Sequence, residues 1–206
     1  MSVLKTAKQK LRSHIKAELQ KISQRTIELQ SKNVHDTLVK FPAFQNAKKV
    51  GIYMHMPHSE IRTLDIIQTC FNLGKQVYLP RCIFEQTYDR KKNHIQLLKV
   101  DAFQQVKELK PHGRFQLLEP TSGEDILESG GLDLLIVPGV AFTRDLKRLG
   151  HGGGFYDEFI QTYTKTHSHP IIIGIGLTHQ LIDQIPTETH DKKLDAVIID
   201  KDTYMT

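Results

Sequence analysis

The feature that most constrains the fold is a set of short apolar segments separated by stretches with helical periodicity. One lies at residues 132–137, a second at Ile171–Ile175 and a third at Ala196–Ile199. A strand that exposes one face to water alternates polar and apolar residues, whereas a parallel strand covered on both faces is continuously apolar. These segments therefore predict an α/β fold: a three-layer sandwich with a mostly parallel central sheet and helices on both faces.

Helical segments are expected before and between these strands. The first forty residues read as helix, because apolar side chains recur there at three- and four-residue steps. They are Leu4, Ala7, Leu11, Ile15, Leu19 and Ile22. Thr63 is placed to cap a helix that Gly74 ends, and residues 156–163 form another helical pattern. Residues 107–120 contain two prolines and a glycine, so they predict a long irregular connection.

The remaining strands are predicted upstream of the glycine-rich region. They are residues 50–54, 76–79 and 94–100, and Pro80 is expected to close the second of them. The 206 residues show no repeat and no linker, so residues 1–206 are expected to form a single domain. A domain of this size can bury a core without disulfides.

Charge and cysteine content narrow the classes of partner. The formal net charge is +5, which favours anionic partners, but the basic residues are scattered and argue against nucleic-acid binding. Cys70 and Cys82 have no metal or redox spacing, so reduced thiols and an intracellular location are expected. The best apolar run, Leu134–Val137, stops at Pro138 and is too short to span a bilayer. We expect a cytoplasmic monomer, with the mitochondrial matrix as the alternative compartment because the basic N-terminal helix could resemble a presequence.

The strongest local feature is the run Arg148-Leu149-Gly150-His151-Gly152-Gly153-Gly154-Phe155-Tyr156-Asp157. Four glycines in five residues are costly to order unless the backbone must stay exposed. Successive N–H groups without Cβ atoms can converge on a phosphate, and the following helix adds its positive end. The run matches neither the dinucleotide fingerprint nor a Walker motif. It therefore predicts an anion site, with a flexible loop as the alternative.

Charged side chains next to this turn are candidate ligands. Asp157 could hold Mg²⁺ through oxygen or water, or could only complement the helix dipole. Asp191 by itself is a solvated loop acid, and Arg148 could pair with phosphate or face water. His55, His58 and His151 lie near the proposed site, but their spacing does not mark a metal site, so a lining role is favoured.

The chain resembles the 5-formyltetrahydrofolate cyclo-ligase family, also called 5,10-methenyltetrahydrofolate synthetases, over nearly its whole length. The resemblance is carried most specifically by Pro138-Gly139-Val140-Ala141-Phe142, then Arg148-Leu149-Gly150, then Tyr156-Asp157. It extends to Lys8 through Arg12, Tyr53 through Thr63, Leu79-Pro80-Arg81, Gly174 through Gln180 and Pro186 through Asp195. It implies conversion of 5-formyltetrahydrofolate to 5,10-methenyltetrahydrofolate with ATP and Mg²⁺, releasing ADP and phosphate. It also implies phosphorylation of the formyl oxygen and ring closure by N10.

The resemblance assigns site residues as well. The implied ATP site comprises Lys8, Gln9, Lys10, Leu11, Arg12, Arg148, Leu149, Gly150, His151, Gly152, Gly153, Gly154, Phe155 and Tyr156. The implied folate site comprises Met54, Glu60, Phe115 and Tyr156, and the implied Mg²⁺ ligands are Asp157 and Asp191. Arg148 and Arg12 are the implied catalytic charges that neutralise the transferring group.

Three departures from the family pattern bear on these assignments. Several relatives carry lysine at the position of Gly153, and some place tryptophan at the position of Phe115. The loop at residues 56–60 is one residue longer than in some members, which affects the register of Glu60. A non-catalytic folate- or nucleotide-binding paralogue is the main alternative function. An RNA-associated module and a sugar-phosphate isomerase fit the sequence less well, the first because basic and aromatic residues are not interleaved.

Overall fold

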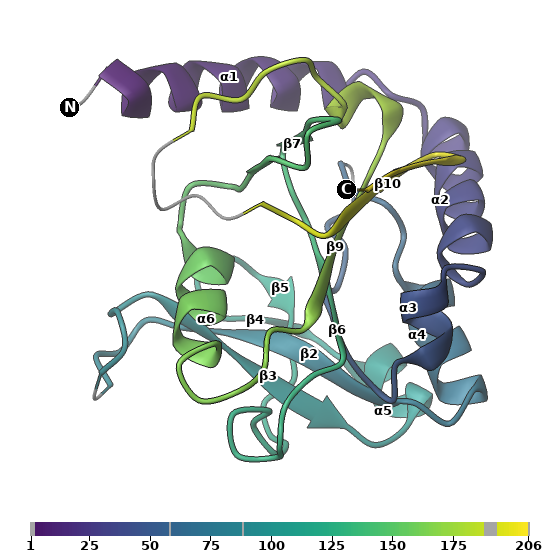
Figure 1. The fold of residues 1–206 in the computed structure, drawn as a ribbon, viewed down its shortest axis with the longest axis vertical. Coiled ribbons are helices and arrows are strands. Elements are labelled where there is room, and N and C mark those ends of the chain that lie inside the picture. The colour runs from purple at the N-terminus through teal and green to yellow at the C-terminus, as the bar shows by residue number, and fades with distance from the viewer. Residues whose placement is uncertain (1–2, 58, 88, 188–192, 206) are drawn as a thin grey trace.

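The structure, a computed structural model, describes residues 3–57, 59–87, 89–187 and 193–205. Its centre is a seven-stranded sheet that runs through the middle of the molecule (Figure 1). From one edge to the other the strands are β11 (Asp202–Met205), β10 (Ala196–Ile199), β9 (Ile171–Gly176), β6 (Leu134–Val137), β1 (Lys49–Ile52), β2 (Gln76–Ile83) and β3 (His94–Val100).

Five adjacent strands of this sheet are parallel, which confirms the mostly parallel architecture. They are β10, β9, β6, β1 and β2, and the edge strands β11 and β3 pair antiparallel to them. The chain adds β2 on one side of β1 and later adds β6, β9 and β10 on the other side. The order of strands therefore reverses between β1 and β6, and ligands of open α/β sheets bind at the carboxyl ends of strands at such a point.

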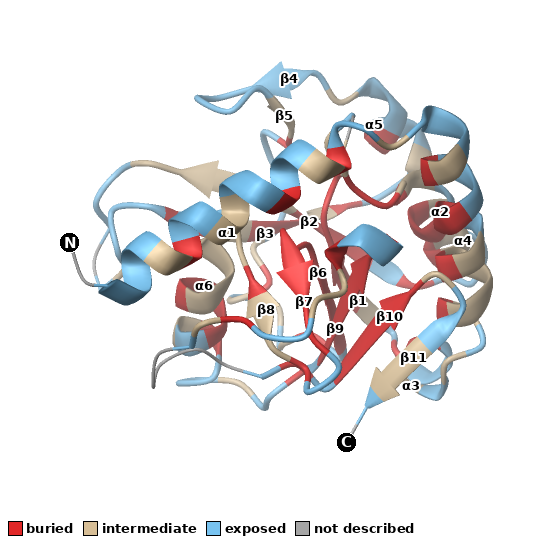
Figure 2. Ribbon diagram, turned by 90° about the horizontal axis from the view of Figure 1, so that it is seen from above, coloured by how far each residue is buried: buried red, intermediate tan, exposed pale blue. Residues whose placement is uncertain are grey.

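Two hydrophobic cores, one on each face of the sheet, establish the three layers. In β6, Leu134 and Ile136 belong to one core, whereas Leu135 and Val137 belong to the other, as the two-residue period of a strand requires. Helices α2 (Gln24–Leu38) and α4 (Leu64–Asn72) pack on the first face, and α6 (Phe155–Tyr163) packs on the second (Figure 1). Figure 2 shows the buried strands enclosed between these more exposed helices.

The other elements are short or peripheral. They are α1 (Val3–Leu19), α3 (Pro42–Asn46), α5 (Phe103–Glu108), the 3₁₀ helix η1 (Thr178–Gln180), the hairpin β4 (Pro111–His112) with β5 (Leu117–Leu118), and the hairpin β7 (Ala141–Phe142) with β8 (Arg148–Leu149). None of the helices in the described part of the chain is long and apolar enough to cross a membrane.

Four local differences from the sequence predictions have a physical reason in the structure. The N-terminal helical region is two helices, because the Ser23 hydroxyl accepts a hydrogen bond from the Thr26 N–H and caps α2. Pro80 does not end β2. Pairing with β1 stops at Tyr78, so β1 has no partner group at Pro80 that would need the N–H that proline lacks. Residues 107–120 contain the β4–β5 hairpin. Thr63 precedes α4 but its side chain makes no cap, because the hydroxyl bonds to His55.

Candidate functional site

The glycine-rich turn lies between β8 and α6, beyond the carboxyl end of β6. Residues 151–154 are exposed, and Gly152 and Gly154 adopt φ angles of +105° and +70°, which side chains rarely tolerate. Gly154 is the N-cap of α6 and supplies no side-chain cap, so the first N–H groups of that helix are not taken up by a capping side chain. This turn has the geometry that favours an anion at the N-terminus of α6.

Two guanidinium groups lie against the turn, each beside a glycine. The Arg12 Nε donates to the Gly150 carbonyl over 2.7 Å, and its Cζ lies 3.5 Å from where a Cβ on Gly152 would be. The Arg148 Nη1 lies 3.0 Å from the corresponding position on Gly150. A Cβ at Gly150 would therefore crowd the Arg148 guanidinium group, whereas a Cβ at Gly152 would be in ordinary contact with that of Arg12.

Helix α1 brings one part of the predicted ATP-binding segment to the turn. Figure 1 shows α1 lying across the end of the sheet, and it packs against η1. Lys8 is buried and lies one helical turn before Arg12, so the two basic side chains share a face of α1. Leu11 packs into the core, whereas Gln9 and Lys10 are exposed.

Arg148 is held inside the protein rather than on its solvated surface. Its side chain is 6% exposed, and its Nη2 donates to Asp157 Oδ1 over 2.7 Å. Its Nη1 donates to the Pro138 carbonyl over 3.3 Å, and its Cζ lies 5.7 Å from the centre of the Tyr156 ring. These contacts fix the guanidinium group beside the turn, as electrostatic catalysis requires of a preorganised donor.

The predicted metal ligands are only partly described. Asp157 lies in the first turn of α6 and its side chain is 40% exposed, with Arg148 on one of its two oxygens. Asp191 lies outside the described residues. Within residues 3–57, 59–87, 89–187 and 193–205, no three His, Cys, Asp or Glu side chains are grouped as metal ligands. One carboxyl group beside a turn that favours an anion does fit Mg²⁺, because this ion takes one or two carboxylates and completes its shell with phosphate and water.

A second set of side chains follows β1, the other strand at the reversal point. Glu60 is buried, and its Oε2 accepts a hydrogen bond from the Met56 N–H over 2.8 Å. Its Oε1 lies 3.3 Å from the His151 Nε2 in the glycine turn. The loops after β1 and β6 therefore meet in one place. Met54 is buried in the core, so it can contribute only a limited surface to a ligand.

Two tyrosines lie near Glu60. Burial raises the pKa of the Tyr156 hydroxyl, and nearby Glu60 raises it further. The pKa of the buried Tyr53 hydroxyl is raised by the same two causes, burial first and then Glu60. Both phenols are therefore neutral at physiological pH and available as hydrogen-bond donors.

An aromatic cluster of Phe84, Phe115 and Phe155 borders the site. The ring centres are 5.5 Å apart for Phe84 and Phe115, 6.0 Å for Phe84 and Phe155, and 6.1 Å for Phe115 and Phe155, and all three pairs meet edge to face. Phe115 is nevertheless 49% exposed, so the cluster presents an apolar surface to solvent. Phe84 was not predicted, since a lone phenylalanine after a strand has no pattern that indicates a ligand.

The histidines considered from the sequence have separate environments. His55 accepts a hydrogen bond at Nδ1 from the Thr63 N–H over 3.1 Å, and burial followed by the charge of Arg62 lowers its pKa. His151 contacts Glu60, and His58 lies outside the described residues. His55 and His151 thus have hydrogen-bonding or electrostatic roles in the described structure.

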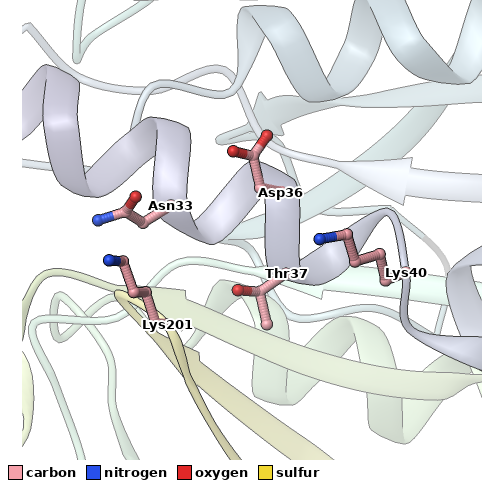
Figure 3. A pocket seen from close by; sticks show the side chains of 5 residues that line it. All are labelled: Asn33, Asp36, Thr37, Lys40 and Lys201. Carbon is pink, nitrogen blue, oxygen red and sulfur yellow. The ribbon is translucent and has the colours of Figure 1, made fainter.

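A hollow of about 520 Å³ lies away from this site (Figure 3). It is lined by Asn33, Asp36, Thr37, Lys40 and Lys201. Asn33, Asp36 and Thr37 belong to α2, Lys40 follows that helix, and Lys201 lies between β10 and β11. None of the predicted site residues lines it, so it is not the site considered above.

Comparison with known proteins gives a consistent result. The sequence model of the 5-formyltetrahydrofolate cyclo-ligase family matches residues 4–200. A Saccharomyces cerevisiae protein named 5-formyltetrahydrofolate cyclo-ligase is 35% identical over 93% of this chain and 94% of its own length. A Mus musculus protein of the same name is 29% identical over 94% of this chain and 93% of its own.

A solved structure shares the fold. The NMR structure of Aquifex aeolicus 5,10-methenyltetrahydrofolate synthetase has a TM-score of 0.74 and 24% identity, covering 96% of this chain and 92% of that one. At this identity the likeness supports the architecture alone, and it agrees with the three layers described above. The match over residues 4–200 establishes more: the chain belongs to the 5-formyltetrahydrofolate cyclo-ligase family of enzymes, as the sequence resemblance predicted.

Proposed function

We propose that this chain converts 5-formyltetrahydrofolate to 5,10-methenyltetrahydrofolate in a reaction that consumes ATP and releases ADP and phosphate. The observation that carries the proposal is the seating of Arg12 and Arg148 against a glycine turn at the N-terminus of α6. Together they concentrate positive charge where a γ-phosphoryl group would have to be stabilised. Family membership supplies the identity of the second substrate.

The proposed reaction has two bond-forming steps. The formyl oxygen on N5 attacks the γ-phosphorus, the bond to the β-phosphate breaks, and ADP leaves. N10 then attacks the formyl carbon and loses its proton. The carbon–oxygen bond breaks, phosphate leaves with that oxygen, and the five-membered ring is closed. Neither step needs a covalent nucleophile from the protein, so catalysis consists of positioning and charge stabilisation.

The residues at the turn have complementary roles in this reaction. The N–H groups of residues 150–154 and of the first turn of α6 bind phosphate oxygens. Arg148 stabilises the charge that develops on the transferring group, and its bond to Asp157 orients it. Arg12 and Lys8 approach from α1. Mg²⁺ held by Asp157, with Asp191 as the proposed second ligand, would neutralise phosphate charge.

The folate lies on the β1 side in this proposal. Glu60 and Tyr156 provide polar contacts, and Phe115 and its neighbours provide the apolar surface for the ring system. Glu60 is close to the turn through His151, so it lies on the side where the two substrates react. Met54, which is buried in the core, would add only a small apolar surface to this side.

A turnover assay tests the proposal directly. Purified protein is mixed with 5-formyltetrahydrofolate and Mg²⁺, with and without ATP, and the near-ultraviolet absorbance of the methenyl product is followed. We expect an ATP-dependent rise that is lost in Asp157→Ala and kept in Asp183→Ala, a matched change at an exposed aspartate. Folded protein that binds ATP or folate without turnover would identify a non-catalytic paralogue. Absence of binding to both ligands would refute the proposal.

The assembly and compartment are proposed from the sequence. We propose a monomer with two small-molecule substrates in the cytoplasm, with the mitochondrial matrix as the alternative. An Arabidopsis thaliana relative at 24% identity is named as mitochondrial. Light scattering at micromolar concentration tests the first point, and fluorescence localisation of a tagged chain tests the second.

A further inference from the structure

A buried carboxyl group beside the aromatic cluster is not used by the proposed function. Glu119 directly follows β5, and its side chain is 4% exposed. Its Oε2 is buried and accepts no hydrogen bond from any residue that the structure describes. The His112 Nδ1 lies 3.9 Å from this oxygen, which exceeds hydrogen-bond distance. A buried acceptor without a donor is destabilising, so its retention indicates a function.

The position of Glu119 connects it to the proposed folate site. Burial, and after it the neighbouring Glu119 carboxyl group, raises the pKa of the Cys82 thiol, which places Glu119 beside the end of β2. Phe84 lies two residues after Cys82 and contacts Phe115, which lies four residues before Glu119. The end of β2 and the β4–β5 hairpin therefore meet at two successive points, and the carboxyl group lies next to the aromatic surface.

Tyr156 provides an independent link to the same site. Burial raises the pKa of its hydroxyl, and the further contributions include those of Glu60 and Glu119. Both carboxyl groups are therefore close enough to Tyr156 to act on it electrostatically. Glu60 faces the glycine turn through His151, whereas Glu119 faces the hairpin that carries Phe115. Glu60 and Glu119 therefore approach Tyr156 from two different parts of the site.

We propose that Glu119 binds the pyrimidine edge of the reduced pterin ring, through its N3–H and its 2-amino group. These two adjacent N–H donors match the two oxygens of a carboxylate, and such paired hydrogen bonds are strong and directional. The neighbouring phenylalanines supply the apolar surface that a flat ring requires. Glu60 is then left for the end that carries the formyl group. This inference rests on the proposed function, since it takes 5-formyltetrahydrofolate as the ligand.

Binding requires the hairpin to yield, because Glu119 Oε2 is covered. Residues 111–116, which belong to this hairpin, are all exposed, so moving them away from Glu119 exposes little additional buried surface. Gly113 contributes to this, because a Cβ there would lie 3.8 Å from Oε2 and would occupy part of the space beside it. The edge of the ring would take the place that the His112 side chain holds near the carboxyl group.

Equilibrium binding tests the inference with a matched pair of variants. Dissociation constants for 5-formyltetrahydrofolate and for its 2-desamino analogue are measured by calorimetry on the wild type, Glu119→Gln and Glu128→Gln. Glu128 is exposed and serves as the control. We expect Glu119→Gln to bind the parent folate about 10- to 100-fold more weakly, since it loses a charge-assisted acceptor and places an amide N–H against the 2-amino group. The ATP dissociation constant and Glu128→Gln should match the wild type.

The analogue distinguishes recognition from a structural role. The wild type should prefer the parent folate over the desamino analogue by about tenfold or more, and this preference should fall toward unity in Glu119→Gln. An unchanged preference in the variant, or a folate affinity within twofold of the wild type, overturns the inference. If the variant does not fold, absence of a preference in the wild type overturns it and a tenfold preference supports it. If the wild type turns over 5-formyltetrahydrofolate and Glu119→Gln binds it with unchanged affinity, only this inference is refuted. If the wild type does not bind folate, both proposals are refuted.

Discussion

Replacement of Arg148 by alanine is the most direct test of the site. The side chain is 6% exposed and makes hydrogen bonds to Asp157 and to the Pro138 carbonyl. If it stabilises the transferring phosphoryl group, its removal costs about 2.7–4 kcal/mol of transition-state stabilisation. Turnover should therefore fall about 100- to 1,000-fold, with a much smaller change in the KM for folate.

The variant should remain folded, so that the loss is catalytic. Asp157 is 40% exposed and water can replace its partner, so the ion pair itself contributes at most about 1 kcal/mol. Loss of the contact with the Tyr156 ring adds about 0.5–1 kcal/mol. A total near 2 kcal/mol lowers the melting temperature by about 4–8 °C in a chain of this size. Thermal unfolding monitored by far-ultraviolet circular dichroism measures this, since the chain contains no tryptophan.

Two further variants make the reasoning refutable. Arg144 lies on the same β7–β8 hairpin with an exposed side chain, so Arg144→Ala should keep wild-type turnover. Arg148→Lys keeps the charge but loses the two-pronged geometry, and it should recover only part of the activity. A folded Arg148→Ala enzyme with turnover within threefold of the wild type would show that the guanidinium group has a structural role and not a catalytic one.

Three other predictions concern Arg12, Gly153 and the buried thiol of Cys70. Arg12→Ala should raise the KM for ATP by about tenfold, because it removes a charge seated on the turn, whereas the exposed Lys16→Ala should not; equal KM values in initial-rate kinetics would contradict this. Gly153→Ala should raise the KM for both substrates, because a Cβ there would lie 2.4 Å from the Phe155 ring; a two-substrate kinetic matrix that shows no change in either KM would contradict it. Burial raises the pKa of the Cys70 thiol from 9.0 to about 12, so the folded protein holds a proton that the unfolded chain releases above pH 9. Stability is therefore fully present below pH 9 and should fall by up to about 1.4 kcal/mol per pH unit between pH 9 and 12, an increment that denaturant titrations of Cys70→Ala should lack.

The sheet was predictable because its signal is local. Burial on both faces forces continuous apolar runs, and residues 134–137 and 171–176 form the strands β6 and β9 that their composition predicted. The extent of β2 was not predictable in the same way. Pro80 is tolerated only because β1 is too short to reach it, and the length of a neighbouring strand is not visible in the sequence around a proline.

The glycine turn was predictable because its signal is also local, but the side chains that contact it were not. Four glycines in five residues have few structural explanations, and Gly152 and Gly154 do adopt the left-handed backbone that glycine permits. That Arg12 would reach this turn depends on a contact between residues 138 positions apart. Helical spacing placed Lys8 and Arg12 on one face, and only the packing of α1 across the sheet determines what that face meets.

The burial of Glu119 is the feature of the site that was least predictable from the sequence. Its sequence neighbourhood, Leu117-Leu118-Glu119-Pro120, is that of an ordinary acidic residue at the end of a short apolar stretch. Most glutamates in such positions are exposed, so the sequence gives no reason to place this one in a pocket. Its burial arises because the hairpin folds against the end of β2, near Cys82 and the residue Phe84 that follows the strand.

The contact between Gly153 and Phe155 links the two halves of the site. The Phe155 ring lies where a side chain on Gly153 would be, and the same ring packs against Phe84 and Phe115. A phosphate that orders the turn would therefore also fix one wall of the proposed folate surface, since both depend on the same two residues. Binding of either ligand would immobilise the Phe155 ring. The second ligand would then bind without that loss of conformational entropy. In the proposed function, the short glycine turn would therefore couple the nucleotide and folate sites without any movement of the sheet.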